Sequence, residues 1–308
     1  MIHPQIGQVL ASLPASDPGP LDPAAMRAGE AAQVPPVADR IPVGSVDDSV
    51  ANGVPVRIYR GVSQMAVTSS PQSGDKFTPK RGTLVYFHGG AFFLGSLDTH
   101  DHVARHLANA TGWTVVSVDY RLAPEHAFPA GLEDGWAVVT WAAEQGGPVA
   151  LAGDSSGGTF AAALAARAHD AGLDAVTHQI LYYPSLDLDF DESRYGSLRS
   201  EARGHGLETV GLKPFNAFYL DSGADPADPR VSPIKRADLS GLPSALIVTA
   251  EHDPLRDEGE LYGRRLAEAG VPTTVSRYDG ANHGFVANFS WIPEFARVFD
   301  ETATFLNP

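Results

Sequence analysis

A pentapeptide of the form Gly-x-Ser-x-Gly constrains this chain more than any other feature. It spans Gly153–Gly157, with Ser155 at its centre. The residues before it, Val149–Ala152, form a short apolar run typical of a buried strand, and an alanine-rich stretch typical of a helix follows. A sharp turn between a strand and a helix forces the serine into a strained conformation, and only glycine leaves room beside it. The alternative interpretation is a glycine-rich turn that carries an ordinary surface serine.

The pattern of apolar residues predicts the fold class. Two apolar runs flank Asn52-Gly53, which is the strongest short signal for a β-hairpin. Residues 61–82 are polar and are expected to form a loop, and apolar runs then alternate with helical stretches, which is typical of a parallel sheet covered on both faces. The sequence predicts an α/β fold with an eight-stranded, mostly parallel sheet and a final helix over Pro293–Leu306. The expected strands are Ser45–Val50, Val54–Arg60, Thr83–Phe87, Thr114–Asp119, Val149–Gly153, Gln179–Tyr183, Ala245–Ala250 and Thr274–Tyr278.

Two segments do not follow this alternation. Residues 1–44 are rich in proline and alanine, and residues 185–235 hold many Asp, Gly and Pro, with a possible helix near Lys213–Leu220. Loops of that length usually have a function. We therefore expect both segments to form a helical cap over a catalytic domain made of residues 45–184 and 236–308.

Composition excludes several classes of partner. The net charge of −15 makes nucleic acid and anionic membrane surfaces poor partners, and the absence of cysteine excludes disulfides and thiolate zinc sites. The N-terminus has no basic stretch followed by an apolar one, and no apolar run reaches the length of a membrane span. A cytoplasmic enzyme is the expectation.

The ends of the predicted strands carry the chemically useful residues. In open α/β sheets, ligands bind at the carboxyl ends of the strands. One strand ends in His88–Ala91, another in Ser155, a third in Asp253 and the last in His283. The chain order is serine, acid, histidine, which is that of α/β hydrolases; the serine peptide also resembles that of chymotrypsin-like proteases, but these have the order His, Asp, Ser.

These residue types suit nucleophilic catalysis. Serine is a weak nucleophile, so His283 would accept the proton of Ser155, and an imidazole changes its protonation near neutral pH. Asp253 would hold the other ring nitrogen and stabilise the imidazolium. It has the best position after its strand, although three other carboxylates compete for the role of acid: Glu251, Asp257 and Glu258.

A tetrahedral intermediate also needs backbone N–H donors aimed at its oxyanion. The glycine turn offers Gly89, Gly90 and Ala91, and Ser156 offers the N–H directly after the nucleophile. These four residues are the predicted oxyanion hole.

Several stretches together resemble the hormone-sensitive-lipase-like family of bacterial esterases (family IV) within the α/β hydrolases. The resemblance covers most of the chain from about residue 83. It implies carboxylesterase activity on short- to medium-chain esters, no cofactor, and a cap built from the N-terminus plus an insertion. The matching stretches are His88–Phe92, Leu97–Asp101, Asp119–His126, the serine peptide, Asp253–Gly259 and His283–Phe285.

Two residues depart from the pattern of that family. Ala91 stands where a third glycine is usual, and its Cβ is expected to crowd the substrate while its N–H survives. Ser156 stands where alanine is usual, and its hydroxyl is expected to bind locally.

Other polar residues are expected to be structural. His88 would shape the glycine turn, and Asp154 and Glu125 would brace loops. His102 and His106 lie four residues apart and suggest a metal site with His100, but no further ligand matches them. We expect no metal and no cofactor.

The resulting hypothesis is a serine carboxylesterase that acts through an acyl-enzyme on a small-molecule ester. An amidase or a lactonase with the same three side chains is the first alternative, and a non-catalytic relative that binds small molecules is the second. The exposed edge of the last strand could pair in a homodimer.

Overall fold

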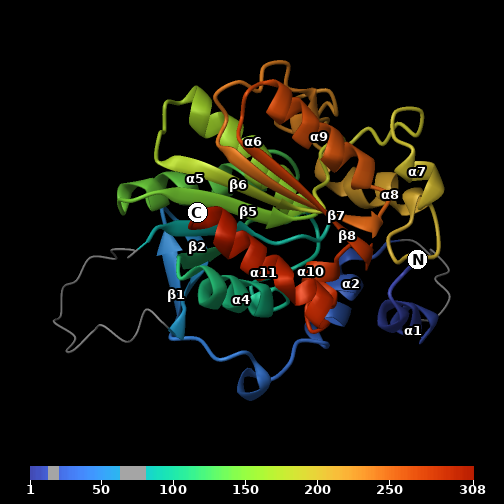
Figure 1. The fold of residues 1–308 in the computed structure, drawn as a ribbon, viewed down its shortest axis with the longest axis horizontal. Helices are drawn as coiled ribbons and strands as arrows, with labels where there is room; N and C mark the ends of the chain where they lie inside the picture. The colour runs from blue at the N-terminus through green and yellow to red at the C-terminus, as the bar shows by residue number, and fades with distance from the viewer. Residues whose placement is uncertain (13–20, 63–80) are drawn as a thin grey trace.

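One twisted sheet of eight strands organises the molecule (Figure 1). The structure is a computed structural model that describes residues 1–12, 21–62 and 81–308, so most of the predicted loop 61–82 lies outside the described part. The strand order is β1-β2-β4-β3-β5-β6-β7-β8; β2 pairs antiparallel with β1 and β4, and the other neighbours are parallel. The predicted fold class is confirmed. The strands are β1 Ser45–Ala51, β2 Val54–Arg60, β3 Thr83–Phe87, β4 Thr114–Val118, β5 Val149–Asp154, β6 Val176–Tyr182, β7 Ser244–His252 and β8 Thr273–Asn282.

The hairpin and the central strands form for the expected reasons. Asn52 and Gly53 have φ values of 45° and 89°, which suit the tight turn that pairs Ala51 with Val54. Every residue of β3, β4 and β5 is buried, as expected for strands covered on both faces. The carboxyl ends of the parallel strands meet at one edge, where the site is built.

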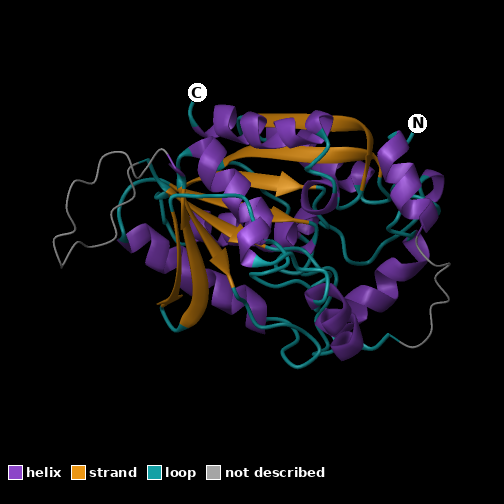
Figure 2. Ribbon diagram, turned by 90° about the horizontal axis from the view of Figure 1, so that it is seen from below, coloured by secondary structure: helices purple, strands orange, loops and turns teal. Residues whose placement is uncertain are grey.

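Helices cover both faces of the sheet (Figure 2). One face packs α4, α10 and α11 with a cluster of apolar side chains, and the other packs α5, α6 and α9 with a second cluster. The last helix has the predicted bounds. No helix in the described ranges is both long and apolar enough to cross a membrane. The helices are α4 Asp101–Thr111, α5 Ala130–Glu144, α6 Ser156–Asp170, α9 Arg256–Glu268, α10 Phe285–Asn288 and α11 Pro293–Leu306.

The insertion 185–235 contains more helix than the sequence indicates. Helix α8 runs over Thr209–Leu220 and so begins four residues before the predicted start at Lys213. Pro214 lies inside α8 and cannot donate a helical hydrogen bond. The burial of Leu212 and Tyr219 stabilises the helix enough to offset that loss. The insertion also holds the short helix α7 (Ser197–Ser200) and the 3₁₀ turn η2 (Pro233–Lys235).

The N-terminal segment holds α1 (Pro4–Ser12), α2 (Pro23–Ala31) and the 3₁₀ turn η1 (Val37–Asp39). Arg27 on α2 donates to the carbonyl oxygen of Phe93 at 2.7 Å and pairs with Glu125 at 2.8 Å. This arginine therefore fastens α2 to the loops that follow β3 and β4.

Candidate active site

Ser155 lies at the turn from β5 to α6 in a strained conformation. Its φ is 53°, a value that serine rarely adopts, and its N–H donates to the carbonyl oxygen of Tyr182 at 2.9 Å. A Cβ on Gly153 would clash with the backbone of Gly157, and a Cβ on Gly157 would clash with the carbonyl oxygen of Phe87. The two glycines of the pentapeptide are therefore required by space.

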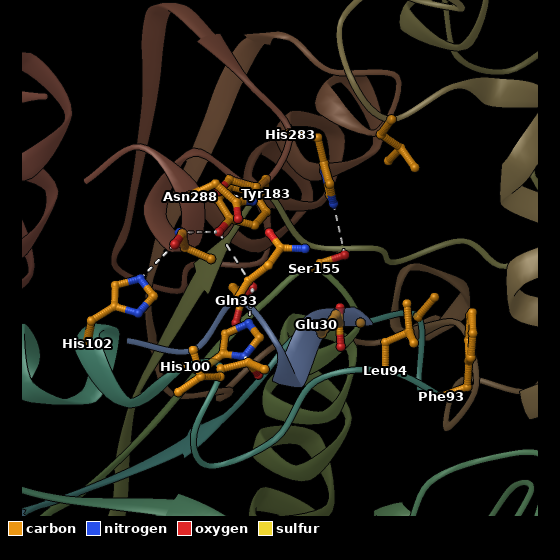
Figure 3. A pocket seen from close by; sticks show the side chains of 18 of the residues that line it. Glu30, Gln33, Phe93, Leu94, His100, His102, Ser155, Tyr183, His283 and Asn288 are labelled. Atoms are coloured by element: carbon orange, nitrogen blue, oxygen red, sulfur yellow. Dashed lines mark hydrogen bonds and ion pairs between the residues drawn. The ribbon is translucent and has the colours of Figure 1, made fainter. Parts of the chain in front are cut away.

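The three side chains of the predicted triad form one chain of hydrogen bonds. His283 Nε2 lies 2.9 Å from Ser155 Oγ, and His283 Nδ1 lies 2.8 Å from Asp253 Oδ2. Asp253 is fully buried, and its Oδ1 accepts the N–H of Leu255 at 2.8 Å. The hydrogen bond from Leu255 fixes the carboxylate, so the imidazole is held between Asp253 and the serine. Figure 3 shows the contact between His283 and Ser155.

The competing carboxylates point elsewhere. Glu251 accepts the N–H of Gly280 at 2.7 Å, Asp257 accepts that of Ser197 at 2.8 Å, and Glu258 accepts that of Leu186 at 2.6 Å. Of the four candidate carboxylates, Asp253 is the one that contacts His283.

The glycine turn after β3 has an unusual backbone. Gly90, Ala91 and Phe92 have φ values of 119°, 48° and 67°, so two non-glycine residues adopt left-handed conformations. The N–H of Phe92 donates to the hydroxyl of Ser156 at 3.3 Å. The serine that replaces the usual alanine thus ties the turn to the start of α6.

The structure departs from the prediction at Gly89. Its N–H donates to Asp154 Oδ1 at 2.9 Å, and so it has no free hydrogen for a substrate oxygen. Among the described residues, the N–H groups of Gly90, Ala91 and Ser156 have no hydrogen-bond acceptor. These three donors remain for an oxyanion.

The carboxylate of Asp154 binds several groups beside the glycine turn. Besides Gly89, its carboxylate accepts the hydroxyl of Tyr86 at 2.6 Å and lies 3.7 Å from Nε2 of His100. Burial opposes ionisation of Asp154, but His100 and Tyr86 outweigh it, so the pKa of Asp154 lies below its ordinary value. An ionised carboxylate therefore fixes the start of the glycine turn.

His88 is a structural residue of the same turn. Its ring stacks on Tyr120 at 4.4 Å and on His100 at 5.3 Å, and its Nδ1 lies 2.8 Å from the carbonyl oxygen of Gly89. Burial, with the neighbouring His100, lowers the pKa of His88 to about 3. A neutral ring with these contacts holds the backbone of the turn.

The three histidines near α4 do not converge. His102 Nε2 lies 2.6 Å from the carbonyl oxygen of Ala287, and His106 stacks on Phe299 at 4.5 Å. His100 instead lies beside Asp154.

A cavity of about 450 Å³ opens above Ser155. Figure 3 shows Phe93 and Leu94 on one side of Ser155 and His100, His102 and Asn288 on the other. The cavity thus has an apolar side and a polar side. The N-terminal segment contributes Glu30, Gln33, Val34 and Pro35 to its lining, and the insertion contributes Leu207 and Phe215. Sequence reasoning missed Glu30, Gln33 and Asn288, because no motif marks them.

Residues 84–287 match a family model described as having the alpha/beta hydrolase fold. That match spans more than half of the chain. The chain belongs to this family. The resemblance to hormone-sensitive-lipase-like esterases is confirmed, because this α/β hydrolase is similar to several proteins named as esterases.

Three relatives illustrate the similarity. Esterase LipI of Mycobacterium tuberculosis is 42% identical over 220 residues, which cover 68% of this chain and 67% of the relative. The ethyl acetate hydrolase of Pseudomonas putida is 35% identical over 249 residues, 78% of this chain and 74% of the relative. The solved structure of a hyperthermophilic esterase from the archaeon Pyrobaculum calidifontis has a TM-score of 0.85 at 36% identity and covers 99% of this chain and 97% of its own.

Proposed function

We propose that Ser155, His283 and Asp253 are the catalytic triad of this α/β hydrolase, which is a carboxylic ester hydrolase. The observation that carries the proposal is the pair of hydrogen bonds, 2.9 and 2.8 Å long, that joins the strained serine through the imidazole to a buried carboxylate. Ser155 Oγ attacks the ester carbonyl while His283 Nε2 takes its proton. The imidazolium then gives that proton to the alcohol oxygen as the C–O bond breaks. Water, deprotonated by His283, attacks the acyl-enzyme and releases the acid.

The oxyanion is stabilised by the N–H groups of Gly90, Ala91 and Ser156. These groups lie on the glycine turn after β3 and at the start of α6, and the bond from Phe92 N–H to Ser156 Oγ links the two. Removing one such donor typically costs about 10²–10³-fold in rate.

Residues 1–44 and 185–235 form the cap in this proposal. Support comes from the cavity above the serine, whose lining includes Gln33 from the first segment and Leu207 and Phe215 from the second. Its volume of about 450 Å³ suits a small ligand. We therefore propose short- to medium-chain esters as substrates, with the apolar part against Phe93 and Leu94. The relative that hydrolyses ethyl acetate supports a small acyl group.

A panel of p-nitrophenyl esters from acetate to palmitate tests the substrate class. The proposal predicts the highest kcat/KM among the short and medium chains and a steep fall toward palmitate, because a long chain exceeds the cavity. A maximum at palmitate would contradict the proposed limit on chain length. If no ester in the panel is hydrolysed faster than it hydrolyses spontaneously in the buffer, the esterase function itself is contradicted.

The amidase and lactonase alternatives are tested with matched substrates. We expect p-nitrophenyl acetate to react far faster than p-nitroacetanilide, since an amine is the poorer leaving group. The hydrolysis of a γ-lactone, measured under the same conditions, tests the lactonase alternative. A higher kcat/KM for the anilide or the lactone than for the ester would change the assigned substrate.

A further inference from the structure

Three side chains from two distant parts of the chain meet at the end of β7. Glu201 and His205 lie in the insertion just after α7, and His252 is the last residue of β7. One ligand atom from each lies within 4.8 Å of the other two. Glu201 Oε2 is 3.1 Å from His252 Nδ1 and 3.3 Å from His205 Nδ1.

The backbone holds these residues in place. Asn282, at the end of β8, donates its side-chain N–H to the carbonyl oxygen of His205 at 2.8 Å, which docks the turn of the insertion onto the sheet. The rings of His205 and His252 lie 4.6 Å apart. The cluster therefore spans the insertion and the strands that carry the triad.

The carboxylate of Glu201 presents one oxygen to both rings. Its Oε1 accepts the hydroxyl of Ser200 at 3.0 Å and lies 3.7 Å from the guanidinium of Arg256. Its Oε2 is left for the histidines. Within the described residues, the buried Nδ1 of His205 makes no hydrogen bond, although Glu201 Oε2 is close. Hydrogen bonding alone thus leaves this nitrogen unsatisfied.

We propose that Glu201, His205 and His252 bind a divalent transition-metal ion of the zinc class. Zn²⁺ binds imidazole nitrogen and carboxylate oxygen at about 2.0–2.2 Å, which places neighbouring ligand atoms of a tetrahedron about 3.3–3.6 Å apart. The two measured separations from Glu201 Oε2, 3.1 and 3.3 Å, require little adjustment. Three protein ligands leave the fourth position to water.

One further contact fits such a site. His252 Nε2 makes no hydrogen bond within the described residues and lies 3.5 Å from Glu251 Oε2, so a carboxylate stands beside the second nitrogen of this histidine, as is common at metal sites. Two imidazoles favour zinc over magnesium or calcium, which prefer oxygen ligands.

The site has a consequence for the cap. His252 directly precedes Asp253, and Asn282 directly precedes His283. A bound ion would fasten the insertion to His252 at the end of β7, next to the acid, while Asn282 already ties His205 to the end of β8, next to the base. The ion itself would stabilise the folded chain and take no part in the chemistry. The sequence analysis expected no metal and did not consider Glu201, His205 or His252 as ligands; the proposed site would revise that expectation.

Calorimetric titration of the untagged, metal-free full-length chain with ZnCl₂ tests the proposal. We expect one Zn²⁺ per chain, and a loss of affinity of about ten-fold or more in both H205A and E201Q. His126, which is exposed and outside the cluster, supplies the control variant H126A. The variants leave Ser155, Asp253 and His283 intact, so zinc held by the triad would still bind.

Thermal unfolding gives a second readout. Zinc should raise the Tm of the wild type and of H126A but not that of H205A, because a ligand that binds only the folded state stabilises it. If H205A does not fold, E201Q, which keeps the shape of the side chain, decides. Equal zinc affinity in the wild type and these variants, or no zinc binding, would overturn the site. MgCl₂ binding as tight as ZnCl₂ binding would overturn the assigned ion class.

Discussion

Backbone strain at single residues shapes the site. Ser155, Ala91 and Phe92 all have positive φ values, and each such residue costs about 1–2 kcal/mol when it is not glycine. The strain persists because the surrounding backbone is tightly packed, as it is at Gly153 and Gly157, and holds these residues in place. It belongs to the two turns that carry the serine hydroxyl and the unbonded N–H groups of Gly90 and Ala91.

Ala91→Gly tests how far this one methyl group limits the substrate. Ala91 lines the cavity, so its removal should raise kcat/KM for esters of branched acids relative to acetate. Relief of the left-handed conformation offsets the extra flexibility of glycine, so the free energy of unfolding should change by less than about 1 kcal/mol. Ratios of kcat/KM for pivalate and acetate esters, with urea unfolding, measure both. An unchanged ratio would show that the Cβ does not limit the acyl group.

Ser156→Ala separates the hydroxyl of Ser156 from its N–H. Phe92 N–H would lose its acceptor, which should cost about 0.5–1.5 kcal/mol of stability. The backbone donor stays, so kcat should remain within about three-fold of the wild type, far from the 10²–10³-fold loss of an oxyanion donor. The kcat for p-nitrophenyl acetate distinguishes these two sizes of effect. A loss of about 10²-fold in kcat would mean that the hydroxyl itself acts in the reaction.

Helix α9 joins the sheet to the insertion through a buried glutamate. Glu258, in the first turn of α9, is fully buried and accepts the N–H of Leu186, just after β6. Burial, with the nearby Asp187 and Asp253, raises the pKa of Glu258 well above its ordinary value. The folded chain therefore keeps this carboxyl protonated to a higher pH than the unfolded chain does.

Glu258→Gln should reduce the pH dependence of stability. A group whose pKa is raised on folding stabilises most below its unfolded pKa, and this contribution is lost as the pH rises. The free energy of unfolding of the wild type should thus fall with pH more steeply than that of E258Q, by at most about 1.4 kcal/mol per pH unit. Urea unfolding between about pH 5 and about pH 8 measures the difference. The control is E294Q, at an exposed glutamate in the first turn of α11; parallel curves for wild type and E258Q would contradict the prediction.

Periodicity and turn chemistry were enough to predict the sheet and the last helix. Asn52-Gly53 predicts the hairpin because its positive φ values are a local property, and the buried strands differ from prediction by a few residues at their ends. Helix α8 was predicted too short, because the burial of Leu212 depends on tertiary packing. The hydrogen bond from Gly89 to Asp154 was not predicted for the same reason, since the two residues are 65 positions apart in the chain.

The whole molecule presents two sheet edges, β1 and β8. The predicted homodimer would pair copies of β8, whose residues Thr274, Val275 and Arg277 are exposed. Lysine on an edge strand disfavours such pairing.

The cytoplasmic location stays a prediction that cell fractionation tests.

Light scattering coupled to gel filtration tests the dimer. We expect the wild type to have twice the mass of one chain and Thr274→Lys to shift toward the monomer. Thr304→Lys, at an exposed residue of α11 away from the edge, should not change the mass. A monomeric wild type would contradict the dimer, and a dimeric T274K would place its interface elsewhere.

In the proposed mechanism, Ser155 is a nucleophile that His283 and Asp253 activate. Covalent labelling with a fluorophosphonate, followed by mass spectrometry of the digested chain, tests it most directly. We predict one label per chain on Ser155, no label in S155A, and labelling slowed by orders of magnitude in H283A. An S155A chain that is labelled, or that hydrolyses p-nitrophenyl acetate as fast as the wild type, would show that Ser155 is not the nucleophile.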